Sequence, residues 1–326
     1  MSPKVPIRAW LIAFAIVAGM VSLILVCRPQ EPQYQGKSLS QYLRGFSKDG
    51  CMILGEPPYD LAGTFSPSPE RAVAWDALGH FGGEALPTFV RLAGSRDSKI
   101  ARYIQGWKRK IPFLRARWPS AEEKHHIAVT AFLRYGSRGV PAIPELLPLL
   151  NDPQTAQPAV YALAFMKPKA APQILALTNV LGESGSMLQI EGIAALGECG
   201  SNAAPAAPVL FQLLNSTNEP VSAMAAVALA RIRAEAPRAA ALIARRLSTA
   251  SQTGFPAPPV EMYLWALGEI GPAAESVRSR INAFTNSSSR KIRDLAVSAL
   301  RRIEPRSNQP VERNRGEPSS FGVSNE

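Results

Sequence analysis

The stretch APVLFQLLNSTNEPVSAMAAVALARI, Ala207 to Ile232, holds one complete unit of a repeating pattern. Its first part, APVLFQLL, has a proline as its second residue, which suits the first turn of a helix because no amide donor is needed there. Its last part, VSAMAAVALARI, carries apolar residues three and four apart, the spacing of one helix face. The stretch therefore predicts two helices joined by a turn.

An Ala-Leu pair, or a near equivalent, marks the second helix of each unit along the chain. The pairs are Ala77-Leu78, Phe132-Leu133, Ala162-Leu163, Ala195-Leu196, Ala228-Leu229, Ala266-Leu267 and Ala299-Leu300. After a longer first gap, their leucines recur at a nearly constant interval, and a fixed period of about 20–50 residues is typical of a solenoid, in which helix pairs stack on one another.

The composition of the 326 residues agrees with an all-α fold. Hydrophobic residues make up 46% of the chain, enough for a core, whereas aromatic residues make up only 7%. Strands draw on aromatic and β-branched side chains, so this balance favours close-packed helices. Pro158 is expected to interrupt and weaken the helix near Gln157.

Residues 10–27 form an apolar segment that carries no charged side chain. As a helix it would rise about 27 Å, close to the roughly 30 Å of a bilayer core. Lys4 and Arg8 precede it, so the positive-inside bias predicts that residues 1–9 are cytoplasmic and the rest of the chain is extracytoplasmic, periplasmic in a Gram-negative cell. Small residues of a cleavage site are missing, which favours an uncleaved single-pass anchor over a signal peptide.

Two flanking segments are expected to lie outside the repeats. Residues 28–69 are predicted to be a linker with a short helix capped by Ser38 or Ser40, because glycine and proline recur from Gly50 to Glu70. Residues 305–326 lack apolar periodicity and are predicted to be a disordered tail. The short helix would carry Leu39, Tyr42, Leu43 and Phe46 on one side.

Residues 96–126 are interpreted as a basic helical insert, because the first leucine spacing exceeds a unit by roughly 20 residues. The net charge of the chain is +11, and residues 96–117 contain eight basic residues and one acid. Together with neighbouring aromatic residues, these charges can bind an anionic surface; the alternative is a helix with its aromatics in the core and its charges in water. The candidate partner-binding or anion-binding residues are Lys108, Arg109, Lys110, Arg115 and Arg117.

Cys199 lies in a stretch, ALGECGSNAAPAAPVLFQLL, that could be the turn of an active site. It stands three residues after Leu196, where other units have apolar residues, so we interpret it as core. Gly197 and Gly200 are expected to end the preceding helix. The cysteines, of which Cys51 and Cys199 could form one bridge, show no zinc-ligand spacing.

The three histidines do not predict a metal site. Glu122 and His126 could share a helix face, but further ligands are not visible, and Ser120 with Glu123 reads as a capping box. His80 falls two residues after a repeat leucine, in a column that mixes Glu198 and Glu269 with Arg231 and Arg302. This column does not repeat Lys or Arg from unit to unit, so we expect no ladder of basic residues, which together with export argues against nucleic-acid binding. No cofactor and no small-molecule substrate is inferred.

The pattern A-x-P-x-L-x-x-L-L-N-D, turn, V-x-x-x-A-x-x-A-L-x-x-I resembles HEAT repeats over residues 70–304. This resemblance implies an α-α superhelix, a HEAT-repeat solenoid, that binds macromolecules on a concave face lined by the Ala-Leu helices. The anchor, the phrase YQGKSLSQYL, the basic insert and AEEKHH are together similar to exported HEAT-repeat proteins from bacteria of the Verrucomicrobia and Planctomycetes type.

The leading functional interpretation is a membrane-anchored extracytoplasmic scaffold for a protein partner. The alternative is a binder of an anionic surface, lipid headgroups or nucleic acid, through residues 96–117. An enzyme is not predicted, because no paired carboxylates, Ser/His/Asp set or phosphate-binding glycine loop stands out.

Overall fold

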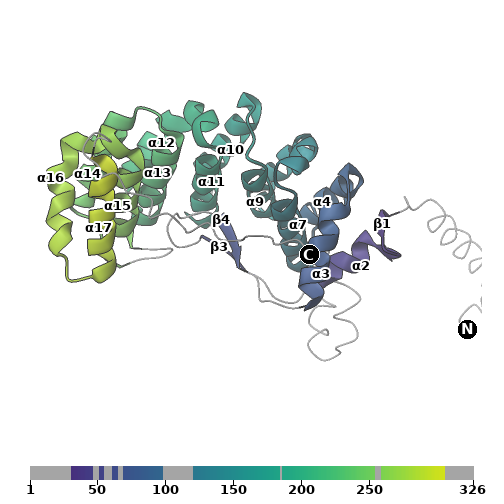
Figure 1. The fold of residues 1–326 in the computed structure, drawn as a ribbon. Helices are drawn as coiled ribbons and strands as arrows, with labels where there is room; N and C mark the ends of the chain where they lie inside the picture. The colour runs from purple at the N-terminus through teal and green to yellow at the C-terminus, as the bar shows by residue number, and fades with distance from the viewer. Residues whose placement is uncertain are drawn as a thin grey trace, which may run out of the picture.

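The computed structural model describes residues 31–46, 51–54, 61–64, 69–97, 120–183, 186–253 and 258–304. These residues form a two-layered stack of helices, an α-solenoid, that runs from α3 to α17 (Figure 1). The predicted anchor at 10–27, the five basic candidates of the insert and the predicted tail at 305–326 lie outside the described residues. Within the described ranges, no helix is both long and apolar enough to cross a membrane.

One layer consists of the helices that carry the Ala-Leu pairs, and each of them packs against the next along the stack. Successive helices of this layer pack more closely than the neighbouring helices α12 and α14 of the second layer, and we call the helices of the Ala-Leu layer the inner helices. The inner helices are α3 (Pro69–His80), α7 (Ala121–Tyr135), α9 (Ala156–Met166), α11 (Ser186–Glu198), α13 (Glu219–Ile232), α15 (Pro259–Ile270) and α17 (Arg290–Ile303).

The second layer consists of helices of 4 to 13 residues, several of which carry a proline in the first turn. They are α4 (Leu86–Ala93), α8 (Ile143–Leu146), α10 (Ala171–Glu183), α12 (Ala207–Leu214), α14 (Ala236–Leu247) and α16 (Arg278–Asn282). Short 3-10 turns connect or extend these helices: η2 (Gly83–Ala85), η3 (Gly136–Ala142), η4 (Leu147–Asn151), η5 (Gly200–Ala206), η6 (Gly271–Val277) and η7 (Ala283–Asn286).

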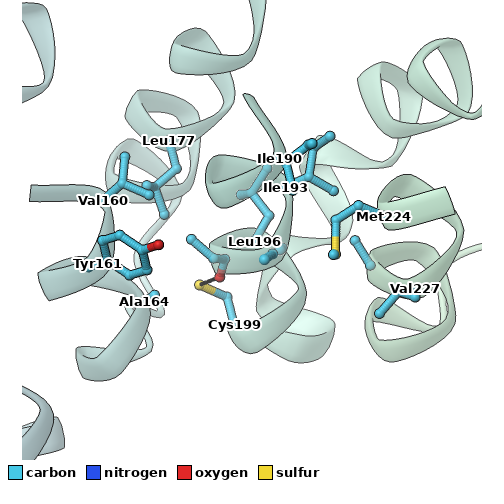
Figure 2. Packing of buried hydrophobic residues seen from close by; sticks show 14 of the residues in the cluster. Val160, Tyr161, Ala164, Leu177, Ile190, Ile193, Leu196, Cys199, Met224 and Val227 are labelled. Carbon is cyan, nitrogen blue, oxygen red and sulfur yellow. Dashed lines mark hydrogen bonds between the residues drawn. The ribbon is translucent and has the colours of Figure 1, made fainter. Parts of the chain in front are cut away.

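The leucines of the repeat form a continuous buried column. Leu163, Leu196, Leu229 and Leu267 have no exposed surface, and they belong to a single core that joins both layers. Figure 2 shows this packing around Leu196, between Val160 and Leu177 on one side and Met224 on the other. Each repeat thus buries its apolar face against its neighbours, which is how a solenoid is stabilised.

The register of α7 differs by one residue from the predicted alignment. Phe132 is fully buried, whereas Leu133 is only partly buried, so Ala131 and Phe132 take the place of the Ala-Leu pair. Tyr135 then falls in the buried column that also holds Cys199, and its hydroxyl donates to the Phe81 carbonyl oxygen at 3.0 Å. The aromatic side chain of Phe132 fills the buried position that leucine holds in the other repeats, and Leu133, although it is a leucine, does not.

Pro158 does not interrupt its helix, contrary to the prediction. It is the third residue of α9, which runs regularly from Ala156 to Met166, and it is buried. The amides of the first turn have no partner within a helix, so a proline there removes no hydrogen bond.

The segment predicted to be an irregular linker contains two antiparallel strands. β3 (Cys51–Leu54) pairs with β4 (Leu61–Thr64), with Cys51 opposite Thr64 and Leu54 opposite Leu61. β4 contacts the inner helices α9 and α11, and the hairpin lies beside them in Figure 1. An isolated two-stranded hairpin is marginally stable, so contact with these helices supports a pairing that the local sequence does not predict.

The N-terminal end of the solenoid is covered by a small unit. It comprises the paired strands β1 (Gln33–Tyr34) and β2 (Lys37–Ser38), then α2 (Leu39–Leu43) and η1 (Arg44–Phe46). Leu39, Leu43 and Phe46 are buried, and α2 packs against α3. At the far side of the gap in the described residues, α7 begins at Ala121, so residues 121–126 of the predicted insert belong to a repeat helix.

Candidate interaction surface

Cys199 is a core residue, as the repeat alignment predicted. Its side chain is buried beside Leu196, its Sγ lies 3.3 Å from the Ala195 carbonyl oxygen, and it is a free thiol. Burial raises the pKa of the Cys199 thiol to about 12, with a further contribution from the negative charge of Glu198. A thiol that stays protonated and shielded is not a nucleophile.

Gly197 has a different role from the predicted one. It lies inside α11, where a Cβ atom would come 3.3 Å from the Cα of Ala228 in α13. Gly268 holds the equivalent place in α15, where a Cβ atom would come 2.9 Å from the Cα of Ala299. These glycines allow neighbouring inner helices to approach closely, while Gly200, with a φ of +58°, ends the helix.

The histidine region is organised by helix capping. Ser120 accepts from the Glu123 amide at 3.1 Å, and Glu123 accepts from the Ser120 amide at 2.8 Å, which confirms the capping box. The His125 ring lies 2.7 Å from the Ser95 carbonyl oxygen. Burial lowers the pKa of His126, with a smaller effect from Arg71. In the described part of the chain, no three His, Cys, Asp or Glu side chains come together as metal ligands.

The inner face offers little free surface in the middle of the stack. Every residue of α13 from Val221 to Ala230 is buried, and β4 contacts α9 and α11. The resemblance to HEAT repeats implied that partners bind this face, but the accessible functional groups of the central repeats gather elsewhere. They lie at one edge of the solenoid, where the inner helices end.

At this edge the column two residues after the repeat leucine forms a ladder of opposite charges. Glu198 ends α11 and contacts Arg231 of α13, with 2.8 Å between Oε1 and Nη1. Glu269 of α15 contacts Arg302 of α17, also with 2.8 Å between Oε2 and Nη1. Each pair therefore joins one repeat to the next. The column alternates acid and base, in agreement with the mixed charges noted in the sequence, and is not a ladder of basic residues.

A second set of cations joins the ladder from the residues that follow the inner helices. Lys167, after α9, places its Nζ 3.2 Å from Oε2 of Glu198. Arg233, after α13, places its Nη2 3.8 Å from Oε1 of Glu269. We call Lys167, Glu198, Arg231, Arg233, Glu269 and Arg302 the edge ladder; it contains four cations and two carboxylates.

The burial of the edge ladder is uneven. The Glu198 and Arg231 side chains are 13% and 12% exposed, and the Arg231 guanidinium lies 5.4 Å from the centre of the Trp265 ring. By contrast, the Lys167 and Arg233 side chains are 60% and 72% exposed. The Glu198–Arg231 ion pair therefore links adjacent repeats. Lys167 and Arg233, which we call the outer cations, present their charge to solvent.

Lys167 and Arg233 adopt a backbone conformation that normally favours glycine. Their φ angles are +51° and +59°. The equivalent residues after α7, α11 and α15 are Gly136, Gly200 and Gly271, which also have positive φ. A left-handed non-glycine residue costs roughly 1–2 kcal/mol. Two repeats thus keep a strained basic residue where the others use glycine.

The edge ladder lines two adjoining open hollows. The first is bordered by Lys167, Glu198, Ser201, Arg231 and Arg233, and the second by Arg233, Glu269, Gly271 and Arg302. Because Arg233 and Glu269 border both, the charged surface is continuous from α9 to α17. The opposite charges, one repeat apart, were visible in the sequence and could have been read as contacts between repeats.

A separate buried carboxyl lies between α9 and α11. Glu191 is 3% exposed, and its Oε1 accepts from Gln157 Nε2 and from the Tyr161 hydroxyl, each at 2.8 Å. Its Oε2 has no hydrogen-bond partner in the described structure. Burial raises the pKa of Glu191, and the two hydrogen bonds partly oppose this. The carboxyl is enclosed between helices and does not border the edge ladder hollows.

Comparisons with known proteins place the chain in no family. No family model matches it, and no curated protein matches it. It is similar to an engineered protein solved by the Northeast Structural Genomics Consortium, with a TM-score of 0.43 and 21% identity over 57% of this chain and 92% of the other. A second engineered protein from that consortium has a TM-score of 0.41 and 21% identity over 72% and 69% of the two chains.

A designed armadillo repeat protein is also similar, with a TM-score of 0.31 and 16% identity over 82% of this chain and all of the other. The assignment of this chain as an all-α helical-repeat solenoid rests on the stacking of its own helices.

Proposed function

We propose that the protein is a scaffold that binds a protein partner along its helical repeats and is held at a membrane by residues 10–27. The observation that carries the proposal is the edge ladder, a continuous charged surface supplied by equivalent positions of successive repeats. Solenoids create extended binding surfaces in this way, because each repeat adds a similar patch beside the last. The Cys199 thiol and the Tyr135 hydroxyl, whose pKa values burial raises, are enclosed in the repeat core and do not border this surface.

In this proposal the repeats lie outside the cytoplasm. The support is the order of charges in the sequence, with Lys4 and Arg8 before the apolar segment and Arg28 alone closely after it. A reporter that is active only outside the cytoplasm, fused after Pro305, should be active. Activity confined to a reporter that works only in the cytoplasm would overturn this orientation.

Partner binding is tested by cross-linking in intact cells, followed by purification of the full chain and identification of the captured proteins. A scaffold should give the same partner from independent cross-links placed at Ser201 and at Glu304, which border the two hollows. Cross-links placed at Glu145 in the second layer serve as a control, because this exposed residue lies outside both hollows. Capture of no protein above the Glu145 control would contradict the proposal.

Binding of an anionic surface through residues 96–117 stays the second candidate, supported by the concentration of basic residues in that segment. Exposed charges contribute little to stability, so replacing Lys108, Arg109 and Lys110 by glutamine should leave unfolding unchanged. Binding to vesicles that contain anionic lipid should fall and should weaken as salt rises. Undiminished vesicle binding by the triple variant would argue that the basic segment is a solvated helix face.

A further inference from the structure

The strained backbones of the outer cations, Lys167 and Arg233, cost free energy that their ion-pair contacts within the repeats do not explain. Glu198 already has Arg231 at 2.8 Å, and Glu269 already has Arg302 at 2.8 Å. Lys167 and Arg233 add second, longer contacts of 3.2 and 3.8 Å while holding strained backbones. Exposed ion pairs contribute little to stability. A glycine at either position would end the helix without strain, as Gly200 does.

Strained backbone is commonly retained at sites where a side chain serves binding. Lys167 and Arg233 border the first hollow together, and most of each side chain is exposed to solvent. The edge ladder as a whole has two more cations than carboxylates. An incoming carboxylate can therefore contact Lys167 or Arg233. Glu198 would stay paired with Arg231, and Glu269 with Arg302.

We infer that the edge ladder is a docking site for an acidic protein segment, whose carboxylates are recognised by Lys167 and Arg233. This inference rests on the proposed scaffold function and names its partner chemistry. Glu198, Glu269 and Glu304 border the same surface, so a polyanion with closely spaced phosphates would meet three carboxylates as well as the cations. An acidic peptide segment can place its charges at the cations alone.

The repeat geometry sets the spacing of the acidic groups. Lys167 follows α9 and Arg233 follows α13, so the two cations are two inner helices apart. Packed helices are about 8–10 Å apart, which makes the separation roughly 16–20 Å. An extended chain rises about 3.3 Å per residue, so acidic groups about five or six residues apart match the two cations.

The test uses the full chain in uncharged detergent and a fluorescent peptide with two Glu-Glu pairs whose centres are six residues apart. A peptide with the same four glutamates in a row is the comparison. We expect the spaced peptide to bind more tightly, and the double variant Lys167→Gly/Arg233→Gly to bind it about tenfold more weakly or worse. The double variant is expected to fold, because glycine suits both backbones.

The matched control is Arg280→Gln/Arg290→Gln, which removes two exposed positive charges away from both hollows. It should bind the spaced peptide like the unchanged chain. Equal losses in the control and in the double glycine variant would overturn the inference, because binding would then follow net charge alone. Equal binding of the two peptides, or competition by equimolar inorganic phosphate, would also overturn it, since either indicates a simple anion site.

Cross-linking separates this inference from the proposed function. If the unchanged chain and the double glycine variant capture the same partner equally, the scaffold function stands and the acidic docking site is wrong. If the unchanged chain captures no partner but binds the spaced peptide as described, the edge ladder recognises acidic segments and the scaffold proposal fails.

Discussion

The carboxylate of Glu198 and the guanidinium of Arg231, far apart in sequence, meet at 2.8 Å across the interface between α11 and α13. Both side chains are largely buried, and Arg231 also lies over the Trp265 ring. Glu269 and Arg302 repeat the contact one step further along the solenoid, but there the arginine is 52% exposed. The same type of ion pair is therefore largely buried between α11 and α13 and more exposed to solvent between α15 and α17.

Arg231→Met should destabilise the protein much more than Arg302→Met. Removing one partner of a buried ion pair costs about 3–5 kcal/mol when the remaining buried charge is left without a partner. Lys167 stays 3.2 Å from Glu198 in Arg231→Met, so the loss should lie at or below the lower end of that range. An exposed pair contributes about 0–1 kcal/mol. Urea unfolding of the two variants measures the difference. Equal losses of unfolding free energy would mean that Glu198 is not shielded as its 13% exposure indicates.

Leu196→Ala should lower the free energy of unfolding by about 2–5 kcal/mol, the usual loss for a buried leucine. Leu196 has no exposed surface and lies in the middle of the stack. Because repeats are stabilised by their neighbours, hydrogen exchange should rise first in α9 and α13. Leu175→Ala is the control, since Leu175 is 60% exposed; a similar loss there would contradict the core assignment.

Gly268→Ala should destabilise, whereas Gly182→Ala should stabilise. An added Cβ at Gly268 would lie 2.9 Å from the Cα of Ala299, so α15 and α17 would have to separate, at a typical cost of about 1–3 kcal/mol. At Gly182 in α10 nothing lies within 4 Å, and alanine favours a helix by about 1 kcal/mol over glycine. Thermal unfolding should shift in opposite directions for the two variants.

Lys167→Gly and Gly200→Lys should have opposite effects on stability. Glycine at 167 relieves a φ of +51° and loses only an exposed ion pair, so the free energy of unfolding should stay level or rise by up to about 1 kcal/mol. A Cβ atom at position 200 meets no neighbour within 4 Å, but lysine there must adopt a φ of +58°, at a cost of about 1–2 kcal/mol. A marked loss of stability in Lys167→Gly would show that Lys167 is structural.

Glu191→Gln should stabilise the protein at pH 7 more than at pH 4. Burial raises the pKa of Glu191 in the folded state, so the folded state holds its proton more strongly than the unfolded state does. Stability contributed by this group is present below its ordinary pKa and is lost as the pH rises through the raised value. Glutamine can keep an oxygen toward Tyr161 without this loss. Urea unfolding at both pH values measures the effect, and a difference between the variants that is independent of pH would contradict it.

The repeat architecture was predictable because it depends on local and periodic information. Evenly spaced leucines, prolines at the starts of second-layer helices and the Ser120 capping box all specify helices through interactions between near neighbours in the chain. The core position of Cys199 followed from the same alignment. The predicted register of α7 was wrong by one residue, because Phe132 occupies the buried position that a leucine holds in the other repeats. Only the burial of Phe132 in the structure shows this.

Pairing across repeats was decided only by the tertiary structure. The charges of Glu198, Arg231, Glu269 and Arg302 were visible in the sequence. A column of mixed charges does not show which residues form ion pairs; the packing of adjacent helices brings the partners within hydrogen-bonding distance. Likewise, the β3–β4 hairpin depends on contacts with α9 and α11, far along the chain. The sequence by itself determined the helices and their repeat, because local preferences are short-range; the stacking of the repeats decided which charges pair and which cations stay exposed.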